Sequence, residues 1–270
     1  MKTLIKILLV VVGFNSFELI SQTSPSNKSF FYPGETLVYK VKWTFLRVGT
    51  ITIKTAPYKN DADHIKVSML VESNPSIPFV DIREYNESVI DRESLMSCSF
   101  YGFYRNGSDE VKYTTEYSDE SKTSVWKAFD VTNHRLIDSI KINKCPRYLD
   151  GPSLFFFTRA NSNQIKVINV PTIIEGKIET TKFIFTGTKE EIEIDALDYP
   201  VMSTQYFGFA DWEGGTSQSL SGEFMGWISN DEAAIPLYAE VKVLLGSLKI
   251  ELESWKRGNW HKQLSADGTR

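Results

Sequence analysis

The sequence predicts an antiparallel all-β fold with one short helix. Along most of the chain hydrophobic residues recur at every second position, which is the period of a strand with one covered face and one wetter face. Residues that favour tight turns, such as Asn106-Gly107 and Glu175-Gly176, separate these runs and are typical of antiparallel hairpins. Only residues 150–160 break the alternation, and they predict the helix.

The first strand is predicted over residues 37–45, with every second residue from Leu37 through Trp43 to Phe45 on the covered face. Residues 47–49 are expected to turn the chain into a second alternating run at 50–54 and so to close a hairpin. Further β-rich runs cover residues 64–72, 80–90, 97–105, 110–116, 123–130, 134–143, 164–174, 177–186, 191–194, 201–207, 219–228, 237–244 and 247–255. Strands this numerous must curl or stack.

The helix is predicted from its start signals. Asp150 can cap a helix, and Pro152 stands in the position of a first helical turn, where a missing N–H costs nothing. An apolar run, Leu154 to Phe157, follows and ends near Ala160. We expect this helix to cover one mouth or one side of the sheet.

The amino terminus predicts export. Lys2 and Lys6 precede a short apolar core, and Asn15 interrupts that core after fewer residues than the roughly 20 that a spanning helix needs. Cleavage after Ser21 is expected to leave Gln22 first, and an uncleaved interfacial anchor is the alternative. No cysteine follows the apolar core, so the mature chain is expected to carry no lipid anchor.

Composition bounds the class of protein. The chain has 270 residues, of which 13% are aromatic and 24% charged, so it is neither disordered nor of low complexity. The net charge of −4 and the absence of a basic stripe in the sequence argue against a nucleic-acid partner. We divide the chain into a signal peptide at 1–21, a polar lead at 22–29, a single β domain at 30–260 and a polar tail at 261–270.

Three segments resemble a known family. They are the start Tyr32-Pro33-Gly34-Glu35, the aromatic helix that ends in Arg159, and the run from Gly222 to Trp255 with its Trp-x-Ser-x-Asp turn. Together they are similar to the bacterial exported family known as domain of unknown function 3108, whose biochemical role is unassigned. The resemblance implies a YmcC-like fold, in which a large antiparallel sheet curls into an open barrel similar to the periplasmic carriers of lipoproteins.

The sequence contains no motif of catalysis or of metal binding that we can identify. His64, His134 and His261 lie far apart and lack the partners of a zinc site. Residues 214–219 are rich in glycine and serine but match neither a nucleophile elbow nor a phosphate loop, so a mobile hairpin loop is the better interpretation. We therefore expect no cofactor, no metal and no catalytic residue.

Two acids and two cysteines receive structural interpretations. Asp231 and Glu232 are adjacent, and in a turn Asp231 is expected to accept backbone N–H groups rather than to act in a pair of acids for glycan hydrolysis. Cys98 and Cys145 are the only cysteines. An exported chain can keep a disulfide between them, but the strict geometry of that bond leaves their pairing open.

The aromatic residues suggest either a filled core or a lined cavity, and the sequence leaves both open. For the cavity, an incompletely filled curled sheet would bind an apolar or amphipathic ligand, with Arg83 or Arg159 available for an anionic head group. The candidate lining residues are Trp43, Arg83, Tyr85, Phe155, Phe156, Arg159, Phe207 and Trp227.

These observations favour a non-catalytic binding protein, periplasmic or secreted, that holds a lipid-like amphiphile or chaperones a component of the envelope. One alternative is an accessory protein that docks other proteins in envelope or polysaccharide assembly. A second alternative is a glycan hydrolase. The sequence predicts no transmembrane segment in the mature chain and does not determine the oligomeric state.

Export predicts a mature protein that begins at or near Gln22, because the apolar core at the amino terminus has the length of a signal peptide. N-terminal sequencing of the protein recovered outside the cytoplasm checks the cleavage site. Recovery of an intact Met1 in the membrane fraction would contradict this prediction.

Overall fold

The computed structural model describes residues 30–77, 81–212, 222–243, 246–258 and 260. The expected signal peptide and the loop at 214–219 lie outside the described residues. The strands are β1 (Thr36–Trp43), β2 (Leu46–Tyr58), β3 (Asp61–Ser73), β4 (Ile82–Asp91), β5 (Ser97–Asn106), β6 (Asp109–Ser118), β7 (Thr123–Asp130), β8 (Arg135–Asn143), β9 (Lys166–Ile174), β10 (Lys177–Ile192), β11 (Val201–Asp211), β12 (Gly222–Ser229), β13 (Pro236–Lys242) and β14 (Ser247–Lys256). The helix is α1 (Gly151–Asn161).

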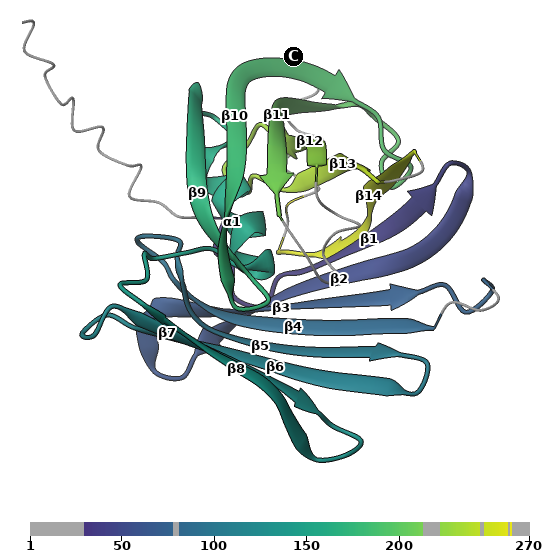
Figure 1. The fold of residues 1–270 in the computed structure, drawn as a ribbon. Coiled ribbons are helices and arrows are strands. Elements are labelled where there is room, and N and C mark those ends of the chain that lie inside the picture. Colours follow the sequence, from purple (N-terminus) through teal and green to yellow (C-terminus); the bar gives the residue numbers. More distant parts are fainter. Residues whose placement is uncertain (1–29, 78–80, 213–221, 244–245, 259, 261–270) are drawn as a thin grey trace, which may run out of the picture.

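The strands form one antiparallel sheet of 14 strands, in the order β8-β7-β6-β5-β4-β3-β2-β1-β14-β13-β12-β11-β10-β9. Neighbours in the sheet are neighbours in the chain, except where β1 pairs with β14. The sheet is not closed, because β8 and β9 remain its two ends. Figure 1 shows β3–β8 as a broad lower layer and β9–β14 curled above it, with α1 between them. The predicted all-β open barrel with one short helix is confirmed.

The first hairpin differs from the prediction. β1 ends at Trp43 and β2 begins at Leu46, so the turn lies at Thr44 and Phe45, where Thr44 has a φ of 56°. Phe45 is 93% exposed and Trp43 is 40% exposed, so neither lies on a covered face as expected. Gly49 lies within β2 instead of in a turn. A Cβ at this position would stand 2.6 Å from the carbonyl oxygen of Glu72, so no larger residue fits there without a shift. The glycine therefore serves the close approach of two strands.

Two predicted runs merge into one strand. Residues 177–186 and 191–194 were expected as separate strands, but β10 is continuous from Lys177 to Ile192. Its pairing with β11 shifts register between Phe185 and Lys189, and Gly187 within this stretch has a φ of +71°. A bulge bends a strand without ending it, which explains the break in the alternation of the sequence.

The predicted helix is confirmed, and its start is fixed to the sheet. Asp150 is the N-cap and forms a capping box with Ser153, which satisfies donors that the first turn leaves free. The other carboxylate oxygen of Asp150 accepts hydrogen bonds from the hydroxyls of Ser88 on β4, at 2.5 Å, and Ser97 on β5, at 2.6 Å. All four side chains are buried.

The space between the helix and the sheet is packed with aromatic rings. Phe156 is fully buried and stacks on Phe31 at 5.0 Å. Phe157 contacts Phe183 on β10 at 5.3 Å, and Phe183 in turn contacts Phe224 on β12 at 5.6 Å. Aromatic burial of this kind supplies much of the driving force for folding. The core therefore lies inside the curl of the sheet, around α1.

Replacing Asp150 with Ala should lower the free energy of unfolding by about 3 kcal/mol. The change removes an N-cap, worth about 1 kcal/mol, and leaves the buried hydroxyls of Ser88 and Ser97 without their acceptor, at about 1 kcal/mol or more each. Urea unfolding of the mature protein measures the difference. Asp150→Asn keeps one acceptor oxygen and should cost less than the Ala variant; equal losses would contradict the role of the shared carboxylate.

Candidate functional site

A buried ion cluster joins three distant parts of the chain. The carboxylate of Glu35, just before β1, accepts two hydrogen bonds of 2.6 and 3.1 Å from the guanidinium of Arg159 on α1. The guanidinium of Arg257, just after β14, donates to the same carboxylate at 2.5 Å. The side chains of Arg159 and Glu35 are 0% and 1% exposed. Bidentate pairing of this kind is the strong and geometrically specific form of an ion pair.

The C-terminal turn completes the cluster. The carboxylate of Asp231 accepts the backbone N–H groups of Ala233 and Ala234, both at 2.9 Å. The carbonyls of these same two residues accept hydrogen bonds from Arg159, at 2.8 and 3.0 Å. The second carboxylate oxygen of Asp231 accepts the indole N–H of Trp260 at 2.9 Å. The turn is therefore held through its backbone N–H groups by Asp231 and through its backbone carbonyls by Arg159.

Because the charges of this cluster are buried, each of them requires an oppositely charged or hydrogen-bonding partner. Removal from water disfavours a charge, and burial lowers the pKa of Arg257 while its neighbour Glu35 opposes that shift. Two guanidinium groups share the carboxylate of Glu35, and the carboxylate of Asp231 is a second negative neighbour of Arg257, so two arginines are balanced by two acids. Its members are engaged with one another, and we assign the cluster a structural role.

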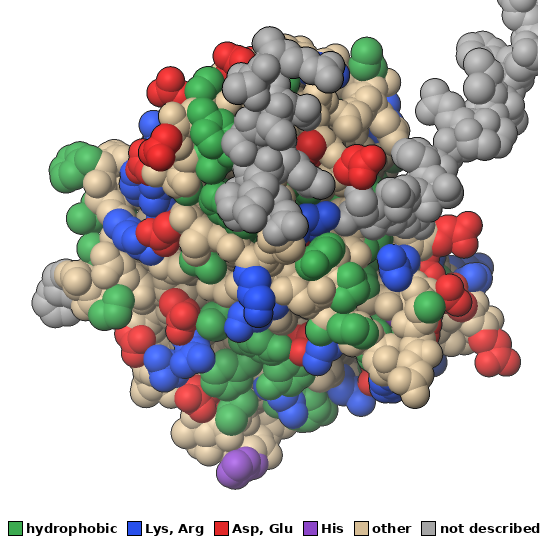
Figure 2. Space-filling model, turned by 180° about the vertical axis from the view of Figure 1, so that it is seen from behind, with side chains coloured by type: hydrophobic (Ala, Val, Ile, Leu, Met, Phe, Trp, Pro, Cys, Tyr) green, Lys and Arg blue, Asp and Glu red, His purple; other side chains and the backbone are tan. Residues whose placement is uncertain are grey.

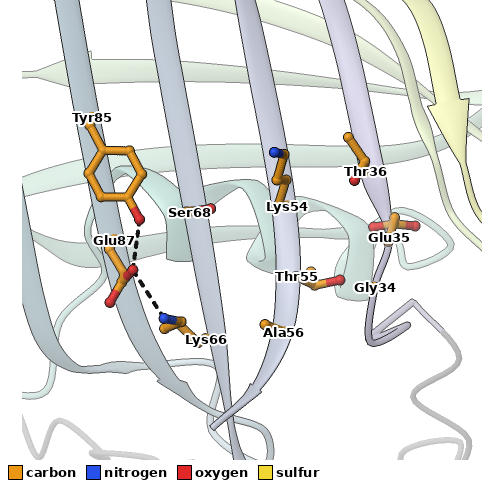
Figure 3. Close-up of a pocket in the computed structure, with 10 residues that line it drawn as sticks. All are labelled: Gly34, Glu35, Thr36, Lys54, Thr55, Ala56, Lys66, Ser68, Tyr85 and Glu87. Carbon is orange, nitrogen blue, oxygen red and sulfur yellow. Dashed lines mark hydrogen bonds and ion pairs between the residues drawn. The ribbon is translucent and has the colours of Figure 1, made fainter.

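A pocket of about 320 Å³ lies next to this cluster. It is lined by Gly34, Glu35, Thr36, Lys54, Thr55, Ala56, Lys66, Ser68, Tyr85 and Glu87. Figure 3 shows these residues on β1–β4 and, for Gly34 and Glu35, just before β1, with α1 behind the strands. On β2 and β3 the neighbours Ile53 and Val67 are buried in the core, so Lys54 and Lys66 point to the opposite, outer face of the sheet.

The pairing register aligns the polar side chains of the pocket. Lys54 on β2 lies opposite Ser68 on β3, and Ser68 lies opposite Glu87 on β4. Glu87 accepts a hydrogen bond of 2.7 Å from the hydroxyl of Tyr85 and lies 3.3 Å from the ammonium of Lys66. Burial, and next the bond to Glu87, raise the pKa of Tyr85 to about 12. Tyr85 is therefore a neutral hydrogen-bonding group at physiological pH.

The charges of the pocket favour an anion. Lys66 is paired with Glu87, whereas Lys54 is exposed and makes no ion pair within the described part of the chain. Glu35, the second acid that lines the pocket, is bound by two arginines, so its negative charge is outweighed. Lysine ammonium groups and hydroxyls donate hydrogen bonds, and together they suit a carboxylate or phosphate group.

The eight residues predicted to line a cavity are divided among several places. Tyr85 lines the outer pocket, and Arg83, two residues earlier on β4, is exposed and lies 3.6 Å from Glu72. Three of them come together on the helix, where the guanidinium carbon of Arg159 lies 5.6 Å from the ring centroid of Phe155 and 4.9 Å from that of Phe156.

The remaining three lie elsewhere in the sheet. Trp43 ends β1, and Phe207 is half-buried on β11. Trp227, on β12, is partly buried, with its ring 5.5 Å from that of Tyr238 and its indole N–H donated to Glu190.

The structure describes both cysteines and two of the three histidines, and His261 lies outside the described residues. Cys98 and Cys145 are free thiols, and burial raises the pKa of both. His64 is bonded to the carboxylate of Asp61 at 2.8 Å, and His134 lies in the turn between β7 and β8. Within the described ranges, no three His, Cys, Asp or Glu side chains are arranged to hold a metal ion. The same part of the chain contains no helix with the length and apolar character needed to span a membrane.

Comparison with known proteins places the chain in a family. Residues 38–253 match the family described as "Protein of unknown function (DUF3108)". The match covers most of the chain, so the protein belongs to this family, as the sequence motifs indicated. No sequence among curated proteins matches the chain.

Solved structures show what the fold is similar to. The chain is similar to a β-barrel-like protein of domain of unknown function DUF1849 from Brucella abortus, with a TM-score of 0.56 and 8% identity, over 84% of this chain and 98% of that one. This similarity shows a shared fold alone.

Two further structures are more distant. A protein of Bacteroides fragilis described as exported and YmcC-like in fold has a TM-score of 0.31 and 9% identity, over 84% of this chain and 99% of that one. A protein of Parabacteroides distasonis described as a lipoprotein has a TM-score of 0.31 and 10% identity, over 84% and 98%. A TM-score of 0.31 is too low to define a shared fold.

Sequence reasoning missed most of the pocket. Lys54 on β2 and Lys66 on β3 alternate with buried residues along their strands, which is also the pattern of ordinary solvent-facing lysines. Glu35 stood in a recognised motif, but only the fold brings it to Arg159 and Arg257. Glu35 follows Pro33 and Gly34 and precedes the strand, so no apolar run in the sequence marks it as a buried charge that requires a partner.

Replacing Glu35 with Gln should lower the free energy of unfolding by about 3 to 5 kcal/mol, because two buried guanidinium groups lose their shared anion. The matched control is Glu253→Gln, which breaks the partly exposed pair with Arg47 and should cost less than about 1 kcal/mol. Chemical denaturation of both variants checks the comparison. Similar small losses for both would show that the buried cluster does not hold the fold.

Proposed function

We propose that this protein is a non-catalytic binding protein of the cell envelope that holds the anionic head group of an amphiphile in the outer pocket of β1–β4. The observation that supports this most directly is the charge of the pocket, where Lys54 is unpaired within the described residues and Glu35 and Glu87 are already bound by cations. An anion entering the pocket would meet an ammonium group that no carboxylate neutralises.

The position of the pocket supports a binding role rather than a chemical one. Its polar groups are two lysines, two acids, hydroxyls and a tyrosine whose pKa is raised to about 12. Glu87 is engaged by Tyr85 and Lys66, and Glu35 is engaged by two arginines. The lining contains no histidine, the side chain that most often serves as a general base.

The packed core supports an outer site. The predicted cavity would have to lie between α1 and the sheet, where Phe156, Phe157 and Phe183 are buried against other rings. A ligand placed there would have to displace close-packed side chains, which is costly. The outer pocket needs no such displacement, because its lining is partly open to solvent.

Export is part of this proposal. It is supported by the charged and apolar amino terminus. The amphiphiles of an envelope carry phosphate or carboxylate head groups next to apolar chains, and the pocket offers donors for the head group.

Charge reversal at Lys54 tests the head-group site. The parent protein should bind butyl phosphate saturably, and Lys54→Glu should weaken that binding by about tenfold or more, because an attractive charge near the ligand becomes repulsive. Isothermal titration at low ionic strength measures the affinity. The control Lys182→Glu reverses the charge of an exposed lysine on β10, away from the pocket, and should leave the affinity for butyl phosphate unchanged. Equal affinity of the parent and the Lys54 variant would contradict the proposed site.

A further inference from the structure

A row of apolar side chains runs from the pocket across the outer face of the sheet. The pairing register places Leu70 opposite Tyr85, Tyr85 opposite Phe103 and Phe103 opposite Lys112. It continues from Lys112 to Phe129 and from Phe129 to Leu136. The row comprises Leu70, Tyr85, Phe103, Lys112, Phe129 and Leu136, one from each of strands β3 to β8. We call these six residues the outer row.

Five of the six residues of the outer row are aliphatic or aromatic. Its single charged member, Lys112, holds its ammonium group 5.0 Å from the ring centroid of Phe129, so its methylene stem can cover apolar surface while the charge stacks on the ring. Tyr85, Phe103 and Phe129 are half-buried, and Leu136 is 50% exposed. Figure 2 shows hydrophobic side chains gathered low on this side of the molecule, over the β3–β8 half, with Lys and Arg side chains among them.

The outer row is continuous with the pocket. Tyr85 belongs to both, because its ring stands in the row while its hydroxyl is bonded to Glu87 in the pocket. The next row along the strands is polar apart from the ring of Tyr101: it consists of Lys54, Ser68, Glu87, Tyr101, Thr114 and Lys127. A molecule with an anionic group in the pocket and an apolar chain would therefore find a polar donor at one end and an apolar strip leading away from it.

The dimensions suit one acyl chain. From Tyr85 on β4 to Phe129 on β7 there are three spacings between strands, or about 14 Å. One leaflet of a bilayer core is about 15 Å thick, half of the roughly 30 Å of the whole core, and this is the depth that the chains of ordinary lipids fill. The segment from β4 to β7 therefore matches the length of one lipid chain.

We propose that the outer row is the track for the acyl chain of a single-chain anionic amphiphile whose head group is held by Lys54 and Lys66. This inference rests on the proposed function, and it adds the chemical class of the ligand and the direction in which the ligand lies. It places the chain on the outer face of the sheet, opposite the face that packs on α1.

The first experiment compares chain lengths. Butyl phosphate and dodecyl phosphate, the latter below the concentration at which it forms micelles, are titrated into the mature protein by isothermal titration. If methylene groups lie half-buried on the outer row, dodecyl phosphate should bind about a hundredfold tighter. Equal affinities for the two would overturn the track while leaving the head-group site intact. Binding of neither would overturn the proposed function as well.

The second experiment removes the far end of the track. Phe129→Ala should weaken the binding of dodecyl phosphate by about tenfold and leave the affinity for butyl phosphate unchanged, because only the longer chain reaches β7. Unchanged binding of butyl phosphate also shows that the variant is folded. The matched control is Phe207→Ala, which truncates another half-buried phenylalanine on β11, outside the row, and should alter neither ligand. Equal effects of the two variants on dodecyl phosphate would overturn the track.

A last measurement separates a single bound amphiphile from a lipid surface. Vesicles of phosphatidylglycerol are added to the parent and to Phe129→Ala, and protein that sediments with them is measured. A track for one chain predicts that dodecyl phosphate competes with the vesicles for the parent protein. Vesicle binding that depends on Phe129, together with no binding of monomeric dodecyl phosphate, would overturn the track and identify the face as a membrane-docking surface.

Discussion

Glu35 and Arg159 form a buried ion pair that constrains how the first strand, the helix and the C-terminal turn are arranged. Glu35 precedes the first strand and Arg159 lies near the end of the helix, yet both are almost fully buried and bound to each other by two hydrogen bonds. A buried charge is tolerated only with a partner at good geometry. The chain must therefore bring the start of β1, the end of α1 and the turn at Ala233 to one point.

The helix consequently connects the two halves of an open sheet. Its first turn is bonded through Asp150 to Ser88 and Ser97 on β4 and β5. Its last turn is bonded through Arg159 to the carbonyl of Ala234, which precedes β13. An open antiparallel sheet has no closing strand pair to fix its curvature, and here β8 and β9 remain at opposite ends of the strand order. Polar anchors at both ends of one helix provide the missing constraint.

The filling of the interior shifts attention to the outer face. Aromatic rings occupy the space between α1 and the sheet, so the side of the sheet that usually carries a ligand in a small barrel is used here for stability. On the opposite face the alternation of each strand leaves a polar row at the pocket and an apolar row beside it. Period-two alternation sets which side chains share a face, while the register decides which of them become neighbours.

The fold class, the short helix with its cap at Asp150, and membership of the family through the motifs around Glu35, Arg159 and Asp231 could be predicted from the amino-acid sequence alone. These are local features, because alternation, caps and turns depend on residues a few positions apart. The sequence prediction misplaced the first hairpin, where Gly49 lies within β2 and serves the close approach of the neighbouring strand β3.

Which residues come into contact could not be predicted from the sequence and follows from the folded arrangement of the strands and the helix. In the sequence, Lys54 and Lys66 have the pattern of ordinary surface lysines, and Tyr85 is one of many aromatic residues. The register of β2, β3 and β4 places these three side chains around one pocket. Equally, Arg159 read as free to meet a ligand until the fold placed Glu35 beside it. Such contacts join residues many tens of positions apart, and they follow from strand pairing and from the need to neutralise buried charge, which local patterns do not encode.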